Sequence, residues 1–298
     1  MGETLNRFSN RLVRDLAWVI ASPPLVSGNF NDTHWWSHKD CLVEFNACLP
    51  ALIALDENPA PLIEHLDKLT TGRLGLRFES FIAYWLTISP NYQLLAQNIQ
   101  IIEPFVSPHK KGSHTHGELD FIIQDIHTNK TIHLEVAVKF YLGTKPYENT
   151  FRWFGTNTKD QLGKKVEHLK NHQTQLSNNF TSYLNKHGYL IDSKQCFLKG
   201  RLFYPQNITI APQGVTENHL RGRWDYSPAT IENKLLFPLD KNDWLAELNY
   251  DDLYQRDLET PLQKNEKALC YVNATQGFKE IERVFYLPED FHFPKIKS

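Results

Sequence analysis

The sequence has no hydrophobic run that approaches the ~20 residues of a membrane-spanning helix, and it has no strong charge of one sign. Lys and Arg total 32 against 34 Asp and Glu. Binding to nucleic acid would therefore depend on a local basic patch and not on the net charge. The chain also lacks internal repeats and Gly/Ser-rich linkers, which favours one main body with attachments.

Four cysteines are spread along the chain without any C-x-x-C spacing, which argues against a zinc knuckle. Reduced thiols of this kind are typical of a cytoplasmic protein. Residues 7–24 have the arginines and apolar residues of a signal peptide, but Asp15 interrupts them, and one helical stripe explains the pattern better. We therefore expect a cytoplasmic protein with no membrane partner.

The order of predicted elements is that of an α/β protein with a mixed sheet flanked by helices. Hydrophobic periodicity predicts the following elements: helices over 5–20, 41–55, 61–86 (with a break near 71–72) and 159–180, and strands over 91–102, 118–123, 131–142 and 195–204. A polar loop is expected over 104–117, and the last third of the chain is expected to be irregular.

Charge is unevenly distributed along the chain. Residues 237–262 carry seven acidic and two basic side chains, and we expect them to form a solvated acidic surface. Residues 139–172 carry seven basic and three acidic side chains and form the local basic patch. Any nucleic acid would be expected to meet this second segment.

The strongest group of candidate site residues lies in a predicted hairpin over 118–142. Because side chains alternate along a strand, Asp120 must share a face with Glu135 and Lys139 once the apolar residues face the core. A turn centred between 127 and 128 places Asp120 opposite Glu135. A turn one residue later places it opposite Ala137.

Two carboxylates and an ammonium group on one face suit metal-assisted hydrolysis of a phosphodiester. Oxygen ligands hold Mg²⁺, with water and substrate phosphate completing its octahedron. The alternative is an ordinary cross-strand network of Asp, Glu and Lys on the surface, which is nearly neutral in energy.

Glu79 is a further candidate because it lies in a predicted helix with apolar residues all round. A buried carboxylate of this kind is either paired or functional. Arg73 and Arg77 are possible partners, although neither has the favourable three- or four-residue spacing.

Basic and polar side chains near the hairpin are candidate contacts to nucleic acid. Five lie on the polar side of the predicted helix after the hairpin: Gln161, Lys164, Lys165, His168 and His172. In the predicted loop before Asp120, His116 belongs to a basic stretch suited to the nucleic-acid backbone, with zinc binding as the weaker alternative. A solvated helix face is the other interpretation of the first group.

Four segments carry a resemblance to a known family: RDLAWVIASPPLV, LRFESFIAYWL, GELDFII and HLEVAVKFYLG. Together they resemble domain of unknown function 1853, a bacterial family within the PD-(D/E)xK nuclease-like superfamily. The resemblance implies a restriction-endonuclease-like core over 72–205, a helical region over 1–71 and an extension packed on the core over 206–298.

The resemblance also implies roles for individual residues in DNA hydrolysis with Mg²⁺ or Mn²⁺. Asp120, Glu135 and Glu79 match the acidic, metal-binding positions. The motif places a lysine two residues after Glu135, where this chain has Ala137. Lys139, about 6.6 Å further along the strand, would then position the attacking water. The alternative is an inactive module of the same fold that binds nucleic acid or protein.

Overall fold

A mixed sheet forms the centre of the computed structural model, which describes residues 5–107, 110–226, 235–256 and 268–295. Its main path runs β3-β4-β5-β7-β8-β11-β10-β9. The strands of the first half are β3 (Tyr92–Ser107), β4 (Lys110–Asp125), β5 (Thr131–Gly143) and β7 (Ser193–Tyr204). β3, β4 and β5 pair antiparallel, whereas β5 and β7 pair in parallel.

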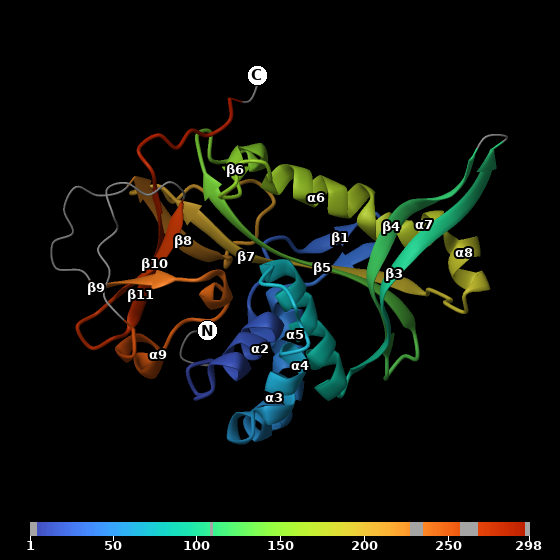
Figure 1. Ribbon diagram of the computed structural model, residues 1–298, viewed down its shortest axis with the longest axis horizontal. Coiled ribbons are helices and arrows are strands. Elements are labelled where there is room, and N and C mark those ends of the chain that lie inside the picture. The colour runs from blue at the N-terminus through green and yellow to red at the C-terminus, as the bar shows by residue number, and fades with distance from the viewer. Residues whose placement is uncertain (1–4, 108–109, 227–234, 257–267, 296–298) are drawn as a thin grey trace.

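The C-terminal part of the chain continues this sheet. It supplies β8 (Leu220–Tyr226), β9 (Leu235–Leu239), β10 (Leu269–Ala274) and β11 (Glu280–Leu287), with the short helix α9 (Tyr250–Tyr254) between β9 and β10. The short strands β1 (Gly28–Phe30), β2 (Thr33–Trp35) and β6 (Trp153–Phe154) lie off the main path. The expectation of an irregular C-terminal third is therefore wrong for β8, β9, β10 and β11, which belong to the sheet (Figure 1).

Helices cover both faces of the sheet. On one face lie α2 (Arg11–Ala21), α3 (His38–Glu57), α4 (Ala60–Leu66) and α5 (Leu74–Ile88), which share the largest apolar core with every second residue of β5. On the other face lie α6 (Leu162–Asn171), α7 (Leu176–Asn179) and α8 (Thr181–Lys186) (Figure 1). The expected mixed α/β sheet flanked by helices is confirmed.

Two predicted elements differ from the structure. The predicted loop over 104–117 is wrong for its described residues, because 104–107 extend β3 and 110–117 extend β4 into a long antiparallel arm (Figure 1). Residues 108–109 lie outside the described residues. The predicted helix over 159–180 is instead α6, a 3-10 turn over Gln173–Gln175 and α7, because His172 leaves the helical conformation at φ −127° and ψ −70°. Among the described residues, no helix has the length and apolar character needed to cross a bilayer.

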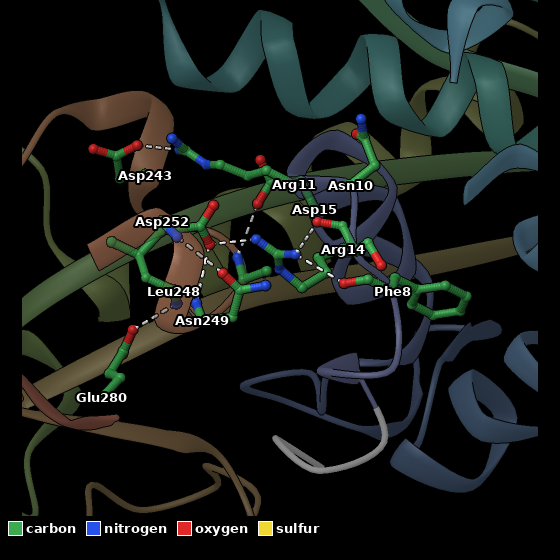
Figure 2. A network of polar contacts seen from close by, with 12 residues as sticks. Phe8, Asn10, Arg11, Arg14, Asp15, Asp243, Leu248, Asn249, Asp252 and Glu280 are labelled. Carbon is green, nitrogen blue, oxygen red and sulfur yellow. Dashed lines mark hydrogen bonds and ion pairs between the residues drawn. The ribbon is translucent and has the colours of Figure 1, made fainter. Parts of the chain in front are cut away.

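The acidic segment near the C-terminus binds the N-terminal helix (Figure 2). Arg14 is fully buried in α2; it donates to the carbonyl oxygens of Phe8 and Ser9 and pairs with Asp252. Arg11 pairs with Asp243 in the same way. The expectation of a solvated acidic surface is wrong for these two carboxylates, because arginines from the other end of the chain neutralise them.

Replacing Arg14 tests this connection. Arg14→Met leaves Asp252 and two carbonyl oxygens without their cationic donor, and we expect a loss of about 3–5 kcal/mol in the free energy of unfolding. Urea denaturation followed by circular dichroism measures the loss. Arg7→Met at an exposed position is the control, with an expected loss below about 0.5 kcal/mol. Equal losses in the two variants would contradict a role for the buried pair.

Candidate functional site

The β4–β5 ladder ends at two carboxylates. Regular pairing runs from Gln124↔Thr131 to Phe121↔Leu134, so that Asp120 and Glu135 come next, opposite each other. Of the two registers open from the sequence, the turn centred between 127 and 128 is confirmed. Beyond this point each of the two side chains accepts a hydrogen bond from a backbone N–H of the opposite strand. Asp120 Oδ2 accepts from the N–H of Val136 at 3.0 Å, and Glu135 Oε1 accepts from the N–H of Asp120 at 3.4 Å.

Strand β3 is also irregular beside Asp120. Gln97 and Ile99 pair with Phe121 and Leu119, but Asn98 between them has φ +55°, in the left-handed region. Non-glycine residues in this conformation are uncommon and cluster at functional sites. The carboxylate of Asp120 is therefore placed where β4 departs from regular pairing with both of its neighbours.

Buried polar side chains fix the orientation of Glu135. His133 Nε2 lies 2.7 Å from Glu135 Oε1, and its Nδ1 lies 3.0 Å from the hydroxyl of Ser177. Burial lowers the pKa of His133 to about 3, so the ring is neutral and donates to the carboxylate through Nε2. Gln173 Nε2 donates to the other oxygen, Oε2, at 3.3 Å.

These supporting residues were not among the predicted site residues. His133 had a signal in the sequence, since it lies two residues before Glu135 and therefore shares its face of the strand. Gln173 and Ser177 had none, because they come from the irregular segment after α6. Only the packing of that segment on the sheet brings Gln173 to Glu135 and Ser177 to His133.

The electrostatics of the site favour protonated carboxyl groups. Burial, together with repulsion by Glu135, raises the pKa of Asp120 to about 8. Burial also raises the pKa of Glu135 to about 7. Neither carboxylate forms an ion pair with a Lys or Arg among the described residues. When the pair ionises, no direct contact with a Lys or Arg among the described residues neutralises its charge.

Glu79 adds a third carboxylate from α5. It is half-buried and is bound by neither Arg73 nor Arg77; instead, Arg77 lies over the ring of Phe81. Burial raises the pKa of Glu79 to about 7, with further contributions from the charges of Asp120 and Glu118. The structure thus brings Glu79 within electrostatic range of the carboxylate pair.

Contrary to the expectation, Lys139 does not lie at the carboxylate pair but binds Asp160. The Lys139 ammonium lies 2.6 Å from Oδ2 of Asp160, whose other oxygen accepts from the hydroxyl of Tyr141. The ammonium that lowers the pKa of Asp120, Glu135 and Glu79 is that of Lys165. Lys165 is half-buried in α6 and has no ion-pair partner among the described residues.

Close packing explains why Ala137 occupies the position where the motif has lysine. Ala137 is buried in the apolar cluster that includes Leu162 and Leu169 of α6. A lysine at this position would be buried in the same apolar cluster, where its charge would lack water. Lys165 also belongs to α6.

The residues predicted to contact nucleic acid lie in different environments. Gln161, expected on an exposed face, is instead buried and donates to the carbonyl oxygen of Phe151 at 3.1 Å. Lys164 is exposed near the start of α6. His116 lies on the β3–β4 arm, where its Nε2 contacts Glu103 at 2.8 Å and its ring packs against Phe180.

Asp120 and Glu135 have the right chemistry for a hard cation. Their oxygens are adjacent, carry uncompensated charge and match the one or two carboxylates by which Mg²⁺ is often held. Within the described residues, no three side chains among His, Cys, Asp and Glu converge on a common position for an ion. Glu79 is therefore a neighbour of the pair and does not complete a three-ligand centre.

The fold and the site together define a mixed α/β protein with paired acidic residues at the end of a strand ladder. The model of the family described as domain of unknown function (DUF1853) matches residues 14–286, and the chain belongs to this family. Comparison with the curated proteins and with the solved structures finds no match.

The raised pKa of Asp120 predicts an unusual dependence of stability on pH. An aspartate whose pKa is about 8 when folded and 3.8 when unfolded binds its proton more tightly in the folded state. Stability should therefore fall as the pH rises from about 4 to about 8. In EDTA, we expect Asp120→Asn to reduce this fall and to raise the melting temperature at pH 8 by roughly 2–4 °C.

Asp125, also in β4, is the matched control, because its pKa is lowered whereas that of Asp120 is raised. Although burial raises its pKa, hydrogen bonds from the N–H groups of Thr128 and His127 outweigh burial and lower it. Asp125→Asn should therefore reduce stability by about 1 kcal/mol at pH 7. Thermal melts at pH 5 to 8 check both expectations, and a loss of stability at pH 8 in Asp120→Asn would contradict the first.

Proposed function

We propose that this protein is a metal-dependent nuclease that hydrolyses phosphodiester bonds of DNA and has a restriction-endonuclease-like core. The observation that carries the proposal is the uncompensated Asp120–Glu135 pair at the end of the β4–β5 ladder. A structural pair of this kind would be expected to have a bound arginine or lysine, because two buried like charges otherwise destabilise the fold. A cytoplasmic location is part of the proposal, supported by four free, buried cysteines.

Asp120 and Glu135 would hold Mg²⁺ or Mn²⁺. When bound, the ion polarises a phosphoryl oxygen and increases the acidity of water. His133 and Gln173 hold Glu135 in one orientation through its two oxygens, which is the usual task of residues behind a metal ligand. Glu79 adds negative charge beside the pair.

Lys165 takes the role that the sequence assigned to Lys139. Its ammonium group lies within electrostatic range of all three carboxylates and is not bound to any of them. An unpaired cation beside the scissile phosphate can stabilise the charge that develops on the phosphate oxygens. Lys139, in contrast, is bound by Asp160.

Cleavage assays on labelled single- and double-stranded DNA test the proposal. With Mg²⁺ or Mn²⁺, we expect cleavage by the wild type and none by Asp120→Asn. Lys165→Ala should lower the rate by about 10²–10³-fold while retaining metal affinity, because its contribution belongs to the transition state. Calorimetric titration with Mn²⁺ measures the metal affinity.

Two other lysines serve as controls. Lys164→Ala removes an exposed charge from the same helix, and Lys139→Ala removes the residue predicted from the motif. We expect each to change the rate by less than about tenfold at saturating DNA. A large loss in Lys139→Ala with normal activity in Lys165→Ala would assign the role to Lys139. A wild type that neither cleaves DNA nor binds the ion would favour the inactive binding module.

A further inference from the structure

A cavity of about 270 Å³ opens beside the carboxylate site, between α5 and the edge strand β3. Leu76 and Phe121 contribute apolar surface, and Glu79 also lines it. Phe121 directly follows Asp120 in the sequence. Because side chains alternate along a strand, Phe121 and the cavity lie on the face of the sheet covered by α5, whereas Glu135 is bound by Gln173 on the other face. Glu79 links the two, because it lines the cavity and its pKa is raised in part by the charge of Asp120.

The strand side of the cavity carries two carboxamides, those of Gln97 and Asn98. Both residues are exposed, and neither side chain forms a hydrogen bond with another described residue. A carboxamide offers both a donor and an acceptor, as do the edges of the nucleobases. The backbone of Asn98 is held at φ +55° opposite Asp120, which directs two consecutive residues of an edge strand to one cavity.

The rest of the lining suits the other parts of a nucleotide. Lys68 at the rim is exposed, has no ion-pair partner among the described residues and can meet a phosphate. The exposed side chain of Leu76 can contact the face of a planar ring. A base pair within a duplex cannot enter such a cavity, because its bases are stacked and their pairing edges are occupied.

We propose that this cavity binds the base of an unpaired nucleotide adjacent to the phosphodiester that is cleaved. The inference rests on the proposed nuclease function and names its substrate class: single-stranded DNA, or a strand end that has separated from its partner. Gln97 and Asn98 hydrogen-bond the edge of the base. Glu79 marks the side of the cavity nearest to Asp120.

Nucleotide binding in EDTA tests the cavity apart from cleavage. Calorimetric titration compares the four deoxynucleoside 5′-monophosphates with deoxyribose 5-phosphate, which has no base. We expect the base to strengthen binding at least tenfold. Gln97→Met removes the amide at similar size, and Asn98→Gly keeps the left-handed backbone accessible. Each should weaken nucleotide binding about 5–10-fold and leave binding of the sugar phosphate unchanged.

Gln93→Met is the matched control, because Gln93 is an exposed carboxamide of the same strand outside the cavity. Equal binding of nucleotide and sugar phosphate, or equal losses in Gln93→Met and Gln97→Met, would overturn the base site. The cleavage assay separates the two proposals. If the wild type cleaves DNA but the Gln97 and Asn98 variants keep normal binding and strand preference, only the base site fails. If base-dependent binding occurs without cleavage, only the nuclease proposal fails.

Discussion

The site depends on two hydrogen bonds from the backbone to side chains, from the N–H of Val136 to Asp120 and from the N–H of Asp120 to Glu135. Each carboxylate binds a backbone N–H of the opposite strand, so the β4–β5 ladder stops where the charges begin. The same bonds hold two like charges close together in a partly buried position. Repulsion and burial both disfavour ionisation there, so the folded state favours the protonated carboxyl groups.

The position of the ammonium group depends on how α6 packs on the sheet. Ala137 of β5 shares an apolar cluster with Leu162 and Leu169 of α6, and Lys165 of the same helix lies within electrostatic range of Asp120. A lysine on the covering helix can therefore take the place of a lysine on the strand. The departure from the nuclease motif at Ala137 is therefore compatible with an active site.

The sequence predicted those parts of the site that depend on strand alternation. Asp120 and Glu135 follow from an apolar pattern with a period of two, which also determines their shared face. Lys165 could not be assigned to the site in this way, since its position depends on helix packing. The β3–β4 arm was missed because its polar residues lack a buried face. The pairing of Arg14 with Asp252 joins residues 238 positions apart, which no local pattern reveals.

The scaffold compensates for a site that is itself destabilising. Uncompensated carboxylates and the left-handed Asn98 both work against folding where they lie. Stabilising pairs are found elsewhere: buried Arg14 binds Asp252, and buried Arg283 binds Glu280 and the carbonyl oxygen of Trp244. The first of these contacts joins α2 to α9, between β9 and β10. Asp120 and Glu135 have no such partner among the described residues, so the proposed site differs from these pairs in the one feature that costs stability.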